Sequence, residues 1–239
     1  MSKVIMICGE PNTGKSHSLR YLENRDKFVF LNCDSKSLPM RKEQGFAADI
    51  KVENPMDVLS YIEQVMKSQT AEGLIIDTLT KLMGQFERKL VDTSSNTLTS
   101  WKDYGNYYNT INDMISVSDK FTIVTAHTQT ELNGQSGNME SKILIKGANG
   151  KLGIDSDHNL IVTTKQMPIS KLRQFENPLL TITEKEERLG VKKVFCTQLT
   201  KEFLGDRTRA PEDFWNDNEV YIDNNVQLII NRYKEYYGS

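Results

Sequence analysis

The sequence lacks any pattern of cysteine and histidine that is typical of a metal site. Its three cysteines, Cys8, Cys33 and Cys196, lie far apart in apolar runs, and no CxxC or Cys/His spacing occurs. An odd number of scattered cysteines does not suit a disulfide framework, and free cysteines in such surroundings are usually buried. We therefore expect three buried, reduced thiols, no cysteine-bound metal and a reducing compartment.

The chain also lacks a long apolar run. No stretch approaches the length of a membrane span, and the apolar part of the N-terminal MSKVIMICGEP is too short for a signal peptide. These absences favour a soluble, cytoplasmic protein.

A strong excess of basic residues is absent as well. Lysine and arginine number 30 against 32 aspartates and glutamates, which gives a formal net charge of −2. A near-neutral chain can still bind nucleic acid through a local basic groove. The composition therefore leaves nucleic-acid binding open.

What the chain does have is an alternation of strand and helix patterns. The expected strands are 4–8, 28–33, 73–78 and 121–128, and the expected helices are 15–24, 55–68 (with Asn54 as its cap), 79–90 and 101–116. A polar break is expected over 92–100. This alternation indicates an α/β protein with a mostly parallel central sheet flanked by helices.

The run GEPNTGKS has the spacing of a phosphate-binding loop, GxxxxGK[ST], between an expected buried strand and an expected helix. In such a turn, backbone N–H groups surround phosphate oxygens at a helix N-terminus. Lys15 would hold the β- and γ-phosphates, and the Ser16 hydroxyl would bind Mg²⁺. The expected nucleotide-binding residues are Gly9, Glu10, Pro11, Asn12, Thr13, Gly14, Lys15, Ser16 and His17.

Polar residues end three of the other expected strands. Asp77 ends the run LIID and suits the second Mg²⁺ contact. Thr78 follows it, where many motor ATPases carry a glutamate as catalytic base, so the base must come from elsewhere. We expect Asp34 to polarise a water facing the γ-phosphate, unless it only begins a polar connection. His127 would sense the γ-phosphate, unless it is a structural histidine.

The pattern changes after residue 127. A segment rich in Gly, Asn and Ser precedes three strand-like runs, NLIVTT, PLLTIT and VKKVFCTQLT, and a terminal helix over 226–237. We expect one domain over 1–239, made of a nucleotide-binding half (1–127), a mobile loop that faces DNA (128–151), and a β-rich completion with the terminal helix (152–239).

Three competing classes of phosphate-loop protein lack their own signals here. There is no NKxD-type segment for a GTPase, and the late chain is mostly strand rather than the Arg-rich lid of a nucleotide kinase. LNGQSGN resembles the ABC signature, but it follows the Asp77 strand and no helix pattern comes after it, so we interpret it as a loop. A RecA-like core remains the best fit.

The order of these pieces resembles RecA-like ATPases, which include DnaB-type helicases and KaiC-like switches. The loop GEPNTGKS, the strand LIIDT without a following glutamate, and the acidic residue that closes FLNCD are the features in common. In that family the catalytic base ends the second strand, which corresponds to Asp34. Relatives commonly have glutamate there, and this departure bears on the rate of hydrolysis.

Within that group, the chain looks most like small phage-encoded annealing and recombination ATPases, the fourth Sak group. IVTAHTQ, KGANGKLGIDSDHNLIVTT and VFCTQLTKEFLGDRTRAPEDF are similar to that group. The resemblance implies ATP, Mg²⁺, single-stranded DNA, assembly into a ring or filament, a host cytoplasm and a single-strand binding protein as a further partner. It also implies a basic residue that reaches the γ-phosphate of a neighbouring subunit, here Arg207 with Arg209 as substitute, unless both only solvate a loop.

The resemblance assigns the DNA contact to 128–151, where Lys142, Lys146 and Lys151 are the basic residues. Lys165, Lys171 and Arg173 would extend a track for phosphates. The tyrosines of YGNYY would stack on bases, unless they belong to the core or to an interface between subunits. Two functions therefore stay open: a DNA-acting ATPase that promotes annealing, and a nucleotide-dependent switch or loader of KaiC or DnaB type that binds protein.

Overall fold

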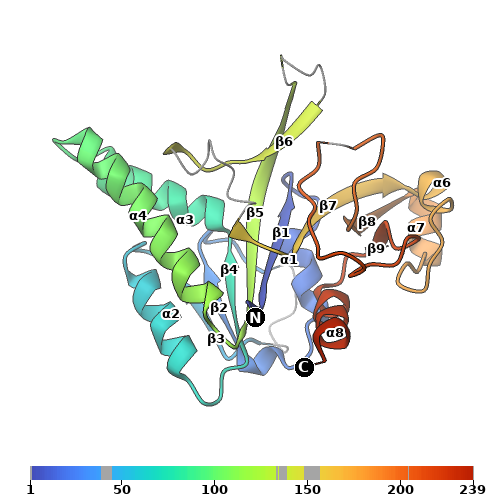
Figure 1. Ribbon diagram of the computed structural model, residues 1–239, viewed down its shortest axis with the longest axis horizontal. Helices are drawn as coiled ribbons and strands as arrows, with labels where there is room; N and C mark the ends of the chain where they lie inside the picture. Colours follow the sequence, from blue (N-terminus) through green and yellow to red (C-terminus); the bar gives the residue numbers. More distant parts are fainter. Residues whose placement is uncertain are drawn as a thin grey trace. The chain divides into compact units, whose positions relative to one another are not determined.

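The computed structural model describes residues 2–38, 45–132, 134, 139–147, 157–203 and 205–238 (Figure 1). The strands are β1 (Val4–Gly9), β2 (Phe28–Asn32), β3 (Ala48–Lys51), β4 (Gly73–Asp77), β5 (Phe121–Leu132), β6 (Met139–Ile143), β7 (Ile161–Pro168), β8 (Val191–Cys196) and β9 (Tyr221–Asp223). Over these residues they form a nine-stranded sheet in the order β3-β2-β4-β5-β1-β7-β8-β9, with β6 beside β5. The mixed α/β class with its mostly parallel sheet is confirmed.

The chain divides into two compact units. Unit 1 comprises Met1–Met6, Asn24–His127 and Ile143–His158, and unit 2 comprises Ile7–Glu23, Thr128–Lys142 and Asn159–Ser239. Strands β1, β5 and β6 each contribute residues to both units.

Unit 1 is built on parallel strands. β2 lies between β3 and β4, and β4 pairs in turn with β5. All five residues of β4 are buried, which is why its sequence is a continuous apolar run rather than an alternating one. Strand β3 was not expected, because its four residues alternate between partly buried and exposed and give no apolar run.

The helices of unit 1 are α2 (Asp57–Lys67), α3 (Leu79–Phe86) and α4 (Thr97–Ser116), with a π-helical turn at Glu87–Val91 after α3 and a 3₁₀ turn at Arg25–Lys27. α2 buries Val58, Ile62 and Val65, one stripe of its surface. α4 begins inside the expected polar break, because the Asn96 side chain accepts a hydrogen bond from Thr99 N and caps the helix.

Unit 2 contains α1 (Lys15–Ser18), a 3₁₀ turn (Leu19–Tyr21), α6 (Ile169–Leu172), α7 (Glu184–Leu189) and α8 (Val226–Tyr237). The helix expected over 15–24 is therefore only one turn of α-helix followed by the 3₁₀ turn. Strands β7, β8 and β9 pair antiparallel, so the C-terminal part of the chain contains the strands that the sequence predicted there. The terminal helix has the expected bounds.

The run PLLTIT is not a strand, contrary to expectation. The Asn177 side chain accepts a hydrogen bond from Leu179 N and turns the chain at its start. At its end, Thr183 forms a capping box with Glu186 and starts α7. Local side-chain bonds at both ends thus outweigh the β-propensity of the residues between them.

The segment expected to be a mobile loop over 128–151 contains regular structure. β5 continues to Leu132, and β6 returns beside it, so the two form a hairpin (Figure 1). Polar alternation in TQTEL and MESKI fits strands that lie beyond the core. Residues 133, 135–138 and 148–156 lie outside the described residues.

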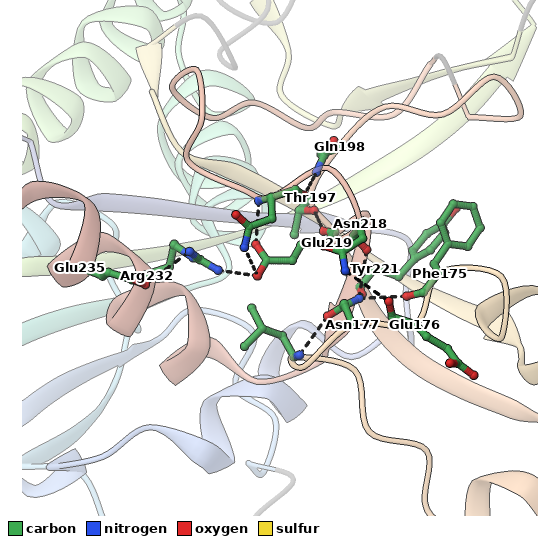
Figure 2. A network of polar contacts seen from close by, with 12 residues as sticks. Phe175, Glu176, Asn177, Thr197, Gln198, Asn218, Glu219, Tyr221, Arg232 and Glu235 are labelled. Carbon is green, nitrogen blue, oxygen red and sulfur yellow. Dashed lines mark hydrogen bonds and ion pairs between the residues drawn. The ribbon is translucent and has the colours of Figure 1, made fainter.

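A network of polar contacts holds the chain around β9 in unit 2 (Figure 2). Asn177 Nδ2 lies 2.9–3.2 Å from the carbonyl oxygens of Phe175, Asn218 and Tyr221. The buried carboxylate of Glu219 accepts from the Asn216 backbone and side chain, and the Arg232 guanidinium lies 2.5 Å from it. These bonds fix the turn before β9, and with it the residues that follow the strand.

Gly73 gives a test of the close strand packing in unit 1. A Cβ at this position would lie 2.2 Å from the Phe28 ring and 2.7 Å from the Phe121 carbonyl oxygen. We expect Gly73→Ala to lower the free energy of unfolding by about 1–3 kcal/mol, measured by urea denaturation. Gly84→Ala is the matched control, because its Cβ would meet only the flexible Arg88 side chain at 3.4 Å within a helix. It should raise stability by up to about 1 kcal/mol; equal effects of both changes would contradict the packing.

Candidate nucleotide-binding site

The phosphate-binding loop of unit 2 is packed tightly against β7. A Cβ at Gly9 would lie 2.2 Å from Thr164 Oγ1 and 2.9 Å from the Thr164 carbonyl oxygen. Thr13 Oγ1 lies 2.5 Å from Thr164 Oγ1, and donates to Glu10 O at 2.7 Å. The glycine that begins the motif is therefore required by the contact with β7.

Lys15 is buried, with 5% of its surface exposed. Its ammonium donates to the carbonyl oxygens of Gly9 and Glu10, both at 2.8 Å. Behind it, Ser18 N donates to Gly14 O and Ser18 Oγ donates to Lys15 O, which closes the first turn of α1. A positive charge is thus held inside the loop, where phosphate oxygens would be bound.

Unit 1 brings Asp34 and Asp77 close to one thiol. Cys33 N donates to Asp77 O at 2.7 Å, and Asp34 is the next residue in the chain. Burial raises the pKa of the Cys33 thiol strongly, and the negative charges of Asp77 and Asp34 add to the shift. The two predicted carboxylates therefore lie at the end of β4 and just after the end of β2, which pair with each other.

Each carboxylate has its own partners. Asp77 is buried and accepts a hydrogen bond from the Thr125 hydroxyl of β5. Asp34 is 17% exposed and pairs with Lys36 at 2.8 Å and with Lys81 of α3 at 3.6 Å. Thr78 accepts a hydrogen bond from Lys81 N and caps α3, which explains a threonine at this position.

The other predicted catalytic residues are divided between the units. His127, in unit 1, is held through its backbone N–H, which donates to Thr80 Oγ1 at 2.7 Å. Arg207, in unit 2, donates from Nε to the Ser141 carbonyl oxygen at 2.5 Å, and its own carbonyl accepts from Thr163 Oγ1. Arg209 pairs through its backbone with Ile161. The role of Arg207 across a subunit interface stays a prediction.

The lysines of the expected DNA track have acidic partners. Lys142 lies 3.9 Å from Glu131, and Lys146 lies 2.6 Å from Glu87. Lys151 lies outside the described residues. In the expected extension, Lys171 pairs with Glu202 and Arg173 with Glu187.

Lys165 does not extend a phosphate track. Its side chain is 17% exposed, pairs with Asp206 at 2.7 Å and lies 3.2 Å from the centre of the Phe203 ring. Burial raises the pKa of Asp206, although the adjacent ammonium opposes the shift. Lys165 is a structural cation.

The tyrosines of YGNYY are core residues, and the alternative that they stack on bases is wrong. Tyr104, Tyr107 and Tyr108 are each 2–4% exposed. Tyr107 stacks on Phe86 with ring centres 4.6 Å apart, and its hydroxyl donates to Pro55 O at 2.5 Å. Burial raises the pKa of Tyr104 to about 12. The three tyrosines lie on the buried face of α4, and Tyr107 contacts α3 through Phe86.

A family model described as an AAA domain matches residues 1–176. The chain belongs to this AAA domain family. It is therefore a P-loop ATPase, as the sequence predicted, and its nucleotide loop lies within the matched residues.

No curated protein matches the AAA domain chain. Among solved structures, it is similar to a KaiC-like protein from the hyperthermophilic archaeon Pyrococcus horikoshii OT3, with 13% identity and a TM-score of 0.47. The match covers 85% of this chain and 82% of that chain. In the described part of the AAA domain chain, no helix is long and apolar enough to span a membrane.

The residues of the AAA domain fit a nucleotide-bound Mg²⁺ rather than a metal cage made by protein alone. Among the described residues, no group of three or more His, Cys, Asp or Glu side chains is placed to hold a metal. Mg²⁺ in ATPases is commonly bound by one or two protein oxygens together with phosphates and waters. The buried Asp77 carboxylate in unit 1 and the Ser16 hydroxyl in unit 2 are suitable donors, and their joint use stays a prediction.

Sequence reasoning missed the side chains that support the loop and Asp77. Thr125, Thr164 and Asn224 lie in or beside strands, 48 to 207 residues from the partners they contact. Thr125 belongs to the run VTAH, where it reads as an ordinary strand residue. Only the pairing of strands shows which hydroxyl faces which motif.

The position of Lys15 predicts that nucleotide binding depends on it. We expect wild type to gain about 2.7 kcal/mol of stability from ATP at a concentration one hundred times its Kd, and Lys15→Ala to gain nothing. The measurement is the melting temperature of each variant with and without ATP and Mg²⁺, because loss of two hydrogen bonds also changes the apo protein. Lys27→Ala, which removes an exposed ion pair with Glu72, is the control and should respond to ATP as wild type does.

Proposed function

We propose that this AAA domain binds and hydrolyses ATP with Mg²⁺, binds single-stranded DNA, and promotes annealing or recombination, as phage-encoded proteins of the fourth Sak group do. It works as a ring or filament of identical subunits. A single-strand binding protein is a further partner in this proposal. The Lys15 loop and the Asp77 strand support the nucleotide part, and the contacts of the β5–β6 hairpin support the DNA part.

For hydrolysis we propose one role for each residue. Lys15 neutralises charge on the β- and γ-phosphates, while Ser16 and Asp77 hold Mg²⁺, which supplies further charge neutralisation when bound. Asp34 polarises the attacking water and takes its proton as the water oxygen bonds to the γ-phosphorus and the bond to the bridging oxygen breaks. Lys36 and Lys81 lie beside Asp34 and orient its carboxylate.

One chain of hydrogen bonds in unit 2 supports coupling between nucleotide and DNA. Thr130 Oγ1 donates to the Glu10 carboxylate of the loop at 2.8 Å. Because its proton is used there, Ser141 Oγ, 3.2 Å away, is the donor to Thr130. The Ser141 carbonyl in turn accepts from Arg207. A shift of the phosphate loop on binding ATP would therefore displace Thr130 of β5, Ser141 of β6 and Arg207 through these hydrogen bonds.

The hairpin and the residues that follow β6 carry the proposed DNA contacts. Lys142 lies on β6, next to Ser141 in this hydrogen-bonded chain, and 56% of its side chain is exposed. Its ion pair with Glu131, 3.9 Å long and exposed on both sides, is weak and exchanges readily for a phosphate. Lys146 and Lys151 continue the basic residues along the same segment.

The second candidate is a nucleotide-dependent switch or loader of KaiC or DnaB type that grips protein through the same hairpin. The observation in its favour is the pairing of lysines with acids, since Lys142 and Lys146 each have a carboxylate within 4 Å. A surface with both signs of charge suits a protein partner better than a polyanion.

Binding of oligothymidylate separates the two functions. Under the DNA proposal, log K falls linearly with log salt at a slope of about −0.7 for each phosphate contacted, and DNA raises ATP turnover. Changing both Lys142 and Lys146 to alanine should make the slope shallower by about 1.4, measured by fluorescence anisotropy. Lys67→Ala on α2 is the control. If DNA neither binds with this salt dependence nor raises turnover, the DNA proposal fails and the switch proposal stands.

Arg207 is the proposed cation that completes a neighbouring subunit's site. We expect Arg207→Ala to lower ATP turnover about 10³-fold while ATP still binds, and Arg209→Ala to have a smaller effect. Mixing Arg207→Ala with Lys15→Ala subunits should restore part of the turnover, because an intact loop can then meet an intact Arg207. Loss of ATP binding in Arg207→Ala would instead place this residue at its own subunit's site.

A further inference from the structure

A buried amide next to the phosphate-binding loop has an unmade hydrogen bond. Asn224 follows β9 in unit 2 and is 5% exposed. Its Nδ2 is buried and has no hydrogen-bond partner among the described residues. A buried donor without a partner is costly, and in native structures it commonly serves a ligand, a water or catalysis.

The amide lies against the loop itself. A Cβ at Gly14 would lie 2.8 Å from Asn224 Oδ1 and 3.1 Å from Nδ2. Gly14 also has a φ of 120°, a backbone conformation that residues other than glycine rarely adopt. The second glycine of the motif is thus the point where β9 and the loop meet, directly before Lys15.

A short relay fixes which way the amide points. Arg20 lies with its guanidinium nitrogen 3.0 Å from His17 Nε2, and an arginine only donates, so Nε2 accepts and carries no proton. A histidine ring carries a proton on at least one of its two nitrogens. Its proton is then on Nδ1, 3.2 Å from Asn224 Oδ1, and the amide must present oxygen to His17. Nδ2 is therefore left as the donor that faces away from the histidine.

The residues on both sides of Asn224 are held in place by hydrogen bonds and an ion pair. Asn225 caps α8 by accepting from Gln227 N, while the preceding Asp223 accepts from Thr181 N and pairs with Lys192 at 3.1 Å. The network around Glu219 and Asn177 holds the turn before β9 (Figure 2). An amide held at both sides loses little freedom when it binds, which favours a specific contact.

We propose that Asn224 Nδ2 donates a hydrogen bond to the nucleotide held by the loop, and that His17 and Arg20 position the amide for it. This inference rests on the proposed function, since it requires that the loop binds a nucleotide. The acceptor is an oxygen of the polyphosphate or an acceptor atom of the nucleoside, and the two are distinguished by using ATP and inorganic tripolyphosphate as separate ligands.

The test compares Asn224→Leu and Asn224→Asp with wild type. Leucine has nearly the shape of asparagine and removes the donor, while aspartate keeps an acceptor for His17 and also removes the donor. We expect both to bind ATP about tenfold more weakly, measured by isothermal titration calorimetry at a temperature where every variant is folded. The melting temperature of Asn224→Leu without nucleotide should change little, because the substitution removes an unsatisfied buried donor together with the acceptor of His17 Nδ1.

Asn54→Leu is the matched control, because Asn54 is an amide of unit 1 whose Nδ2 donates to Asp57 Oδ1. It should lower the melting temperature and leave ATP affinity unchanged. Weaker binding of both ligands by the Asn224 variants places the acceptor on a phosphate, and weaker binding of ATP alone places it on the nucleoside. Wild-type affinity in Asn224→Leu overturns the inference while the nucleotide proposal stands. If wild type binds neither ligand, the nucleotide proposal itself fails.

Discussion

The buried ammonium of Lys15 is the constraint on which the loop depends. A charge taken out of water must be compensated by oxygen ligands, and the carbonyls of Gly9 and Glu10 supply them only because the loop curls around the side chain. That curl brings Gly9 against Thr164 and Gly14 against Asn224. Within unit 2, the loop that encloses Lys15 therefore packs against β7 and against the residue that follows β9.

Sequence predicted best what is local or wholly buried. The motif spacing predicted the loop. The uninterrupted apolar runs predicted β1, β4 and the first part of β5, because a strand that is buried on both faces is apolar at every position. It failed where short-range side-chain bonds decide the outcome. Asn96 starts α4 early, and Asn177 and Thr183 convert PLLTIT into turns and a cap.

The candidate site was predictable by residue type but not by partner. Asp34 and Asp77 follow from the rule that strand ends carry chemistry, and they lie beside the same thiol. The sequence could not show which basic side chains are neutralised by acidic ones. Each basic residue of the expected DNA track that the structure describes lies near an acidic residue at least 11 positions away in the chain: Lys142, Lys146, Lys165, Lys171 and Arg173. The number of lysines in a segment therefore overstates its positive electrostatic potential, because the sequence does not show which lysines pair with acidic residues of other strands and helices.

The location of Cys33 also has a chemical consequence. Thiols are oxidised and alkylated as thiolates, and burial between two carboxylates keeps this one protonated at any cellular pH. Cys196 has the same protection, since burial raises its pKa to about 12. Peroxide and electrophiles should therefore attack the buried Cys33 and Cys196 thiols only slowly.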